Sequence, residues 1–337
     1  MRETELLADR LQEDGAISNL AIRVGKFGDR IGEVYSDGVN SQTLFDLASV
    51  TKIMATTTLV LIAVEQKRLD ITDKVSKFFA VPKWYKDLTV FNLLTHTMGL
   101  GSRDLTGNGD TYDTIAESIL SIKGSAVGER VEYSCPAFIL LGKILEKIYG
   151  ERLDALFRNM VAAPLGLKSS GFLPDKSKHS IVNSNIDENK RGMVNDYNCQ
   201  FLGGVAGNAG LFSNMDDLTV YADMLLSGGG KLISRSVLDM ASRNYTAGMG
   251  QARGLGFLVV DENYRQTDSL FPTGSIGHCG HTGVSLFLNR ESGLYAIILS
   301  DATISTVKKY GKENYDEVMQ MREKLHHAIR NDLWNRG

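Results

Sequence analysis

One run of residues, from 53 to 64, constrains the fold of this chain more than any other segment. Its sequence, IMATTTLVLIAV, contains only apolar residues and threonine. A helix that is apolar all round is buried on every side, and a helix of this length is too short to cross a bilayer. We therefore predict a helix at the centre of a protein large enough to enclose it, and no membrane span.

The size and composition of the chain agree with that prediction. Its 337 residues are 43% hydrophobic and 23% charged, as in ordinary globular proteins of roughly two domains. The formal charge of 37 − 40 = −3 argues against a nucleic-acid partner, which requires a basic surplus. The three cysteines form no C-x-x-C pair, so neither a disulfide scaffold nor a zinc knuckle is expected.

The first fourteen residues hold five acidic groups and no continuous apolar stretch. This pattern does not resemble a signal peptide. We therefore expect a cytoplasmic location.

Strand patterns occur at both ends of the chain, and helical patterns occur between them. The predicted strands cover 19–24, 31–35, 256–260, 281–289 and 294–300. The predicted helices cover 3–13, 88–97, 112–121, 137–149, 153–161, 215–226 and 315–334, and 176–198 is predicted to be loop. This order predicts an α+β fold: an antiparallel β-sheet flanked by N- and C-terminal helices, with an inserted, mostly helical domain. We place the sheet domain at 1–75 and 240–337, and the insertion at 76–239.

An S-x-x-K motif, Ser49 to Lys52, immediately precedes the apolar run. Residues i and i+3 share a helix face, so the hydroxyl and the amine are expected within hydrogen-bond reach. Burial beside an apolar helix is expected to lower the pKa of the lysine, which would let it accept the serine proton. The helix N-terminus directs N–H groups toward a developing anion. The motif thus predicts a nucleophile and its base.

The motif alone is not specific, because Ser305 to Lys308 matches it as well. That copy is followed by a polar stretch rather than a buried helix, and we interpret it as a solvated loop or helix start. On its own, Ser49 would be equally compatible with a helix N-cap and an exposed Lys52.

Two further motifs follow in the chain. Tyr133-Ser134-Cys135 lies where a loop enters a helix, and a half-buried packing tyrosine is its alternative interpretation. Gly280-His281-Thr282-Gly283 opens an apolar strand, and its glycines are expected to leave room for a substrate backbone. A tight bend or bulge in the strand is the alternative.

The three motifs in this order resemble the serine β-lactamase and penicillin-binding-protein family, particularly its class C β-lactamase-like branch of esterases and peptidases. The resemblance covers nearly the whole chain. It includes the phrases FDLA at 45–48, LLTHTMGL at 93–100, PLGL at 164–167 and AGLFS at 209–213. It implies the β-lactamase/transpeptidase-like fold.

The resemblance also implies roles for individual residues. Ser49 would be the acylated nucleophile, Lys52 its activating partner, and Tyr133 would share the acid/base work. His281 stands where the family often has lysine, and its imidazole would donate to Tyr133 or to a substrate group.

The oxyanion hole would comprise the backbone N–H groups of Ser49 and Val284. Thr282, Gly283 and Cys135 are expected to contribute to substrate binding. Cys135 replaces the asparagine of the family's Y-x-N motif, and His281 replaces a charged lysine. The first departure predicts weak recognition of β-lactams and peptides, and the second leaves less fixed positive charge near neutral pH for a substrate carboxylate.

Other interpretations carry less weight. His278 and His281 lack further ligands at helpful spacing, so we expect no metal. The glycine-rich 203–210 stretch lacks the G-K-[ST] ending of a phosphate loop and is expected to be a turn near the cleft. Residues 101–112 are expected to be a mobile rim.

We therefore expect a serine hydrolase that cleaves a small ester, amide or peptide through an acyl-enzyme on Ser49, without a cofactor. Two alternatives remain open on the same fold: a non-turnover penicillin-binding or acyl-serine sensor, and an acyltransferase. The sequence leaves the oligomeric state open.

Overall fold

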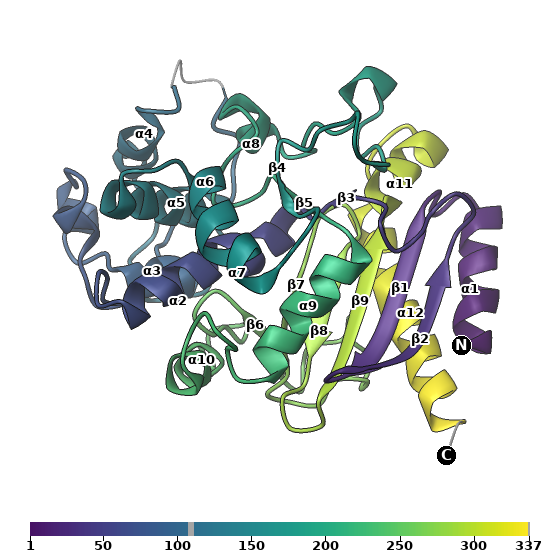
Figure 1. Cartoon of the computed structure of the whole chain (residues 1–337). Helices are drawn as coiled ribbons and strands as arrows, with labels where there is room; N and C mark the ends of the chain where they lie inside the picture. Colours follow the sequence, from purple (N-terminus) through teal and green to yellow (C-terminus); the bar gives the residue numbers. More distant parts are fainter. Residues whose placement is uncertain (107–110, 336–337) are drawn as a thin grey trace.

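A six-stranded antiparallel sheet, built from both ends of the chain, forms one side of the protein (Figure 1). The computed structural model describes residues 1–106 and 111–335. The strand order is β2-β1-β9-β8-β7-β6, and every neighbouring pair is antiparallel. The strands are β1 (Leu20–Lys26), β2 (Asp29–Tyr35), β6 (Leu258–Val259), β7 (Ile276–Cys279), β8 (Ser285–Leu288) and β9 (Leu294–Ser300). The predicted α+β fold with an antiparallel sheet is confirmed.

Helices cover both faces of this sheet because its strands are apolar on both sides. In β9, Ile297 and Leu299 enter the larger core, whereas Ala296 and Ile298 enter a second core. Helix α9 packs on the first face, and α1 and α12 pack together on the second (Figure 1). The α-helices are α1 (Arg2–Glu13), α2 (Thr58–Glu65), α3 (Val90–Leu94), α4 (Ile115–Ser121), α5 (Cys135–Tyr149), α6 (Leu153–Phe157), α7 (Ala163–Leu165), α8 (Tyr197–Phe201), α9 (Met215–Leu226), α10 (Arg235–Ala241), α11 (Ala302–Tyr310) and α12 (Tyr315–Trp334).

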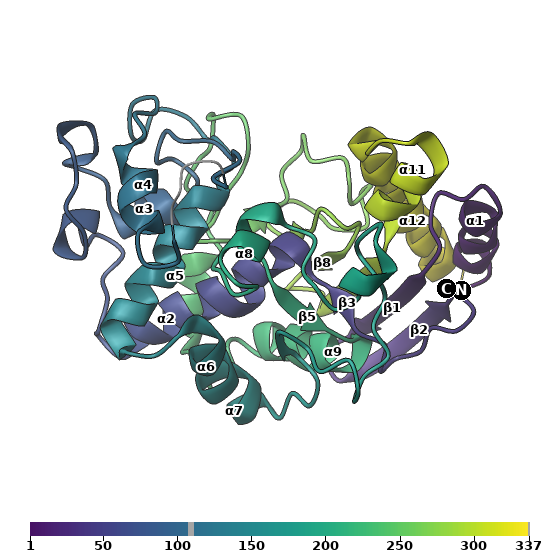
Figure 2. The same cartoon turned by 90° about the horizontal axis from the view of Figure 1, so that it is seen from above.

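Helices α5 and α10 pack against the predicted apolar run, whereas α11 lies beside α12 (Figure 2). That run belongs to a continuous helical segment, in which a 3-10 turn, η1 (Ala48–Val50), leads into a π-helical stretch, η2 (Lys52–Thr57), and then into α2. The central helix is thus confirmed. It is longer than predicted, because the helical segment runs over the 18 residues Ala48–Glu65. The expectation that it is too short to cross a membrane was therefore wrong, since this segment, with a mean hydropathy of 1.4, is long and apolar enough. However, 83% of its residues are buried inside the protein.

A three-stranded sheet that the sequence did not predict joins the central helix to the rest of the chain. It has the order β3-β5-β4, from β3 (Phe45–Asp46), β4 (Gly171–Phe172) and β5 (Leu211–Ser213). Strand β3 directly precedes the turn that carries Ser49. Pairing of β3 with β5 therefore anchors the predicted nucleophile against distant segments.

The sequence analysis also did not predict several short elements, because a short segment shows little hydrophobic periodicity. Strand β7 and helices α10 and α11 are examples. The second S-x-x-K motif lies inside α11, where Ser305 is buried against Asp301 and Ser18 while Lys308 is exposed. Its interpretation as a solvated segment was wrong for the serine. The division into two domains and the cytoplasmic location stay predictions.

Candidate active site

Ser49 and Lys52 lie side by side at the start of the central helix. The Lys52 ammonium donates a hydrogen bond to Ser49 Oγ at 2.9 Å. Ser49 is half-buried, whereas the Lys52 side chain is completely buried. The predicted pairing of serine and lysine is therefore present, and the alternative of an exposed lysine is excluded.

A thiol and a backbone carbonyl complete the hydrogen bonds of Lys52. Its ammonium donates to the carbonyl of Asn208 at 2.9 Å and to Cys135 Sγ at 3.4 Å. Asn208 belongs to the glycine-rich 203–210 stretch, so this stretch forms the predicted turn beside the cleft. Burial lowers the pKa of Lys52, but the charge that Cys135 and Tyr133 carry when ionised outweighs burial. The pKa of the lysine therefore lies above its ordinary value, and the expected lowering was wrong.

Tyr133 covers the serine–lysine pair from the segment before α5. The Lys52 ammonium lies 5.0 Å from the centroid of the Tyr133 ring. Burial raises the pKa of Tyr133, and the charge of Lys52 and hydrogen bonds with Lys52 and Ser49 offset only part of that rise. The buried His96 ring packs on Tyr133 at 4.7 Å, and its Nδ1 accepts from the Ser134 N–H at 2.9 Å. Tyr133 thus contacts Lys52, the partner that the sequence analysis assigned to it, and also Ser49.

The predicted rim also touches the tyrosine motif. Ser102 Oγ accepts from the Cys135 N–H at 2.9 Å and donates to the Tyr133 carbonyl at 3.1 Å. Residues 107–110 of the rim lie outside the described residues.

Asp46 organises the turn that presents Ser49. Its buried carboxylate accepts from the N–H of Ala48 at 2.9 Å and of Asn195 at 2.6 Å. Burial raises the pKa of this carboxyl to about 6, and these hydrogen bonds oppose the rise. Ala48 has a positive φ of 43°, which costs a non-glycine residue of the order of 1 kcal/mol. The carboxylate thus fixes a strained backbone turn next to the nucleophile.

The H-T-G segment forms a tight turn between β7 and β8 and packs against the Ser49 turn. Thr282 Oγ1 donates to the Asp46 carbonyl at 2.9 Å, and Gly283 N–H donates to the Gly280 carbonyl at 3.1 Å. The Val284 carbonyl accepts from Gly280 N–H at 2.8 Å. A Cβ on Gly280 would lie 2.6 Å from the Leu47 carbonyl oxygen. Gly280 therefore makes room for protein backbone rather than for the substrate, contrary to expectation.

The two histidines near this turn differ from the prediction. His281 lies at the exposed end, where its Nε2 is 3.1 Å from Glu313 Oε2 and its ring stacks on Tyr315 at 5.3 Å. The ring beside Tyr133 belongs instead to His278 of β7, with centroids 6.0 Å apart. The expected donation from His281 to Tyr133 is therefore not made. The alternation of side chains along β7 points His278 inward.

A cavity of about 380 Å³ opens directly onto Ser49. Its walls combine residues of all three motifs with side chains from β6, from β7, from the loops before and after β6, and from α12. The lining residues are Ser49, Tyr133, Gln251, Arg253, Leu258, Tyr264, Gln266, His278, Cys279, His281, Tyr315 and Met319.

Arg253 and His278, each only 3% exposed, are two buried lining residues that sequence reasoning did not identify as site residues. It also did not identify Gln251, Leu258, Tyr264, Gln266, Cys279, Tyr315 and Met319. Arg253 lies in no recognisable motif, and the strand that carries His278 is too short to show a pattern. Only their burial beside Ser49 identifies them.

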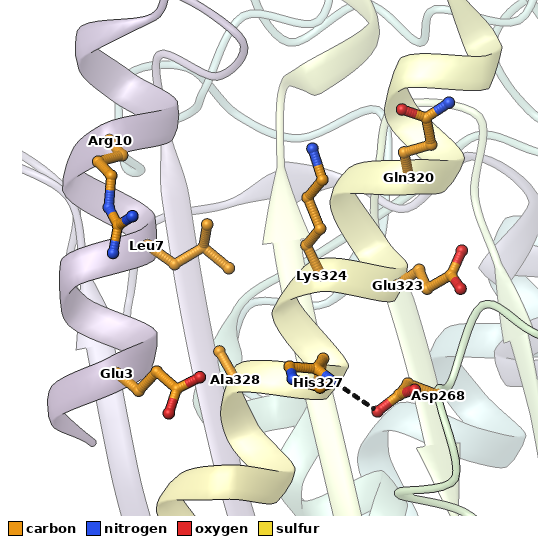
Figure 3. Close-up of a pocket in the computed structure, with 9 residues that line it drawn as sticks. All are labelled: Glu3, Leu7, Arg10, Asp268, Gln320, Glu323, Lys324, His327 and Ala328. Atoms are coloured by element: carbon orange, nitrogen blue, oxygen red, sulfur yellow. Dashed lines mark hydrogen bonds and ion pairs between the residues drawn. The ribbon is translucent and has the colours of Figure 1, made fainter.

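A larger hollow, of about 570 Å³, lies elsewhere, between α1 and α12 (Figure 3). Its lining mixes charges of both signs, and His327 Nδ1 pairs with Asp268 across its edge at 3.1 Å. Neither Ser49 nor Tyr133 lines it. It is therefore separate from the cavity at Ser49.

The comparisons with known proteins agree with this geometry. The family model described as Beta-lactamase matches residues 5–318. The chain belongs to the β-lactamase family. A protein of Escherichia coli K12, provisionally named a D-alanyl-D-alanine carboxypeptidase, is 28% identical over 312 residues, which cover 79% of this chain and 70% of that protein. A Salmonella typhi protein of the same name is 26% identical over 313 residues, with 79% and 71% covered.

Solved structures share the β-lactamase fold. A penicillin-binding protein homologue from Caulobacter crescentus has a TM-score of 0.74 at 15% identity and covers 97% of both chains. EstCE1, described as a hydrolase with promiscuous acyltransferase activity, has a TM-score of 0.76 at 19% identity and covers 96% of this chain and 98% of its own. Family membership therefore supports a serine hydrolase.

Proposed function

We propose that this β-lactamase-family protein hydrolyses a small ester or amide through a covalent acyl-enzyme on Ser49. The hydrogen bond of 2.9 Å between Lys52 Nζ and Ser49 Oγ carries the proposal, because it joins a half-buried hydroxyl to a buried amine at the mouth of a cavity. Tyr133, the third member of the set, lines the same cavity.

In the acylation step, Ser49 Oγ attacks the substrate carbonyl carbon, and its proton passes to the Lys52–Tyr133 pair. The carbonyl π electrons move to oxygen, where the N–H groups of Ser49 and Val284 would stabilise the oxyanion. The tetrahedral intermediate then collapses: the bond to the leaving alcohol or amine breaks, and the pair returns the proton to that group. In deacylation, a water molecule attacks the acyl carbon and gives a proton to the pair. The bond between the acyl carbon and Ser49 Oγ then breaks, and the pair returns the proton to Ser49.

The substrate class is narrowed by Cys135. Its thiol stands where an asparagine amide would contact a substrate amide, and it accepts from Lys52 instead. A thiol is a weak donor and acceptor. The site therefore favours esters and small activated amides over β-lactams. The provisional carboxypeptidase name of the bacterial relatives supports a small peptide as the amide to test.

The test compares wild type with Ser49→Ala on p-nitrophenyl butanoate, on a D-alanyl-D-alanine peptide and on a labelled penicillin. We expect wild type to release p-nitrophenolate over repeated turnovers and to gain the mass of the acyl group on the peptide that contains Ser49. Ser49→Ala should lose at least about 1,000-fold in activity and gain no mass. Unchanged hydrolysis by Ser49→Ala contradicts the proposal.

The same measurement separates the two alternatives that the sequence left open. A sensor would acquire the acyl mass on Ser49 and keep it without turnover. An acyltransferase would transfer the acyl group to an added alcohol or amine in preference to water, which product analysis detects.

A further inference from the structure

His96 is a fully buried histidine outside the three sequence motifs. It lies two residues after the end of α3, with a backbone φ of 58°. Burying a polar ring costs free energy unless its polar atoms find partners, and a left-handed φ costs a residue other than glycine of the order of 1 kcal/mol. The contacts of His96 must offset both costs.

Two hydrogen bonds to His96 flank Tyr133 in the chain. On one side of the tyrosine, the Glu132 N–H donates to the His96 carbonyl at 2.9 Å. On the other side, the Ser134 N–H donates to His96 Nδ1 at 2.9 Å. The centroid of the imidazole ring lies 4.7 Å from that of the Tyr133 ring. One residue therefore holds the backbone before and after the tyrosine and packs on the ring between them.

The segment that carries Tyr133 depends on such contacts. Residues 122–134, all of which the structure describes, join α4 to α5 without a helix or strand. In a segment of this kind, hydrogen bonds to neighbouring parts of the fold determine where the backbone lies. The Tyr133 carbonyl accepts from Ser102, and the N–H groups on either side of the tyrosine donate to His96. The tyrosine is thus placed mainly by the segment 96–102.

His96 is itself supported by further hydrogen bonds. The N–H of its neighbour Thr97 donates to the Asn92 carbonyl at 2.9 Å, and the Asn92 side-chain amide donates to Thr97 Oγ1 at 3.1 Å. The Gly128 N–H donates to the Thr97 carbonyl at 2.8 Å. A residue that positions a reacting group needs supporting contacts of its own. These bonds tie the turn at His96 to α3 and to the loop at Gly128.

The contact between His96 and Ser134 requires a neutral imidazole. Because Nδ1 accepts from the Ser134 N–H, it carries a lone pair, and the ring proton lies on Nε2. Burial and the charges of Arg253, Lys52 and His278 lower the pKa of His96, and the hydrogen bond from Ser134 opposes them only in part. The pKa therefore lies well below its ordinary value, and the acceptor persists at neutral pH.

We propose that His96 is a positioning residue for the hydroxyl group of Tyr133. It holds the backbone on both sides of the tyrosine, and its ring packs on the tyrosine ring. Among the described residues, His96 is not part of the lining of the Ser49 cavity, so it acts through Tyr133 and not on the substrate. This assignment rests on the proposed acyl-enzyme function of Ser49 and adds a residue to its acid/base machinery.

The experiment is a double-mutant cycle on p-nitrophenyl butanoate with wild type, His96→Gly, Tyr133→Phe and the double variant. Glycine removes the ring and the acceptor, and it adopts a positive φ without strain. We expect His96→Gly to lower kcat by about 10- to 100-fold, because a small misplacement of a reacting group costs that much, and to leave KM within about threefold. In the Tyr133→Phe background, the same change should cost less than about threefold, since no hydroxyl is left to position.

Two further variants separate the acceptor from the packing of His96. Asparagine tolerates a positive φ and places a side-chain oxygen near the position of Nδ1, so the kcat of His96→Asn should exceed that of His96→Gly by at least about fivefold. His96→Gln keeps most of the volume but not the acceptor at that position. It repeats the cycle, which stays decisive if His96→Gly does not fold.

His326→Asn is the matched control. His326 is also fully buried, and its ring packs on Phe271 and Phe287 in the second core. Its kcat should stay within about threefold of wild type, because it is remote from Tyr133. Chemical denaturation gives the folded fraction of each variant under the assay conditions, and kcat is corrected for it.

The outcomes distinguish this assignment from the proposed function. If His96→Gly or His96→Gln loses activity equally with and without the Tyr133 hydroxyl, or loses it through KM alone, His96 is not a positioning residue for that hydroxyl. Full activity of Tyr133→Phe also overturns the assignment. Absence of turnover and of Ser49 labelling by a fluorophosphonate in wild type contradicts the proposed function itself.

Discussion

The residue that departs most from its expected chemistry is Lys52. Burial alone favours a neutral amine, but the lysine contacts groups that become anions when they ionise. Tyr133 has a raised pKa as well, mainly because it is buried. In the proposed mechanism the two side chains would act as one unit, and the pair that has lost one proton would accept the proton of Ser49.

This coupling predicts an alkaline pH dependence. Because the pKa values of Lys52 and Tyr133 both lie above their ordinary values, the pair is fully protonated at neutral pH. We expect kcat/KM for p-nitrophenyl butanoate to rise through the range from about pH 7 to 9, by up to roughly tenfold per unit. The rate with Ser49→Ala is subtracted as the background. A profile that levels off at about pH 7 contradicts the assignment of this pair as the base.

At the scale of elements, the site depends on the contact between the β7–β8 turn and the turn before the central helix. Gly280 allows this contact, since a Cβ there would meet the Leu47 carbonyl oxygen and lie 3.2 Å from Ala48 Cβ. The sequence correctly predicted that another group approaches closely at Gly280. It did not show that this group is protein backbone and not the substrate.

Gly280→Ala should therefore displace the Ser49 turn. We expect the free energy of unfolding to fall by about 1–3 kcal/mol, as for other overpacked sites, and fluorophosphonate labelling of Ser49 to slow at least about tenfold. Chemical denaturation and labelling kinetics measure the two effects. Gly171→Ala is the control, because a Cβ at Gly171 meets nothing within 4 Å. Its unfolding free energy should change by less than about 0.5 kcal/mol, and equal behaviour of the two variants would refute this role of Gly280.

At the scale of the whole molecule, hydrogen bonds join the two ends of the chain. The Asp332 carboxylate on α12 accepts from the N–H of Glu3 at 3.0 Å, and from the N–H and hydroxyl of Thr4 at 2.9 and 2.7 Å. These bonds satisfy donors at the N-terminus of α1. Burial works to raise the pKa of Asp332, but these hydrogen bonds outweigh it, and the pKa lies below its ordinary value.

Asp332→Asn should weaken the hydrogen bonds between α12 and the start of α1 and lower the free energy of unfolding at neutral pH by about 1–3 kcal/mol. Since the pKa is lowered in the folded state, the contribution of the carboxylate is present above the pKa of the unfolded chain, about 4, and is lost as the pH falls through the folded value. The difference between wild type and variant should therefore shrink below about pH 4, measured by denaturation across pH. Asp9→Asn, on the exposed face of α1, should show no such difference. If the free energies of unfolding of wild type and Asp332→Asn differed by the same amount at every pH, the proposed role of the Asp332 charge would be contradicted.

The sequence by itself predicted the central helix and the contact between Ser49 and Lys52, because both follow from spacing along one element. Tyr133 followed from the resemblance of its motif to a known family. The sequence also determined β9 and α12, whose periodic patterns are long. Only the tertiary structure decided that His278 rather than His281 lies beside Tyr133, and that Arg253 is buried in the wall of the Ser49 cavity. The physical reason is that burial, pKa and unpaired hydrogen-bond groups depend on neighbours brought together from distant segments. Spacing along the chain carries no information on those neighbours.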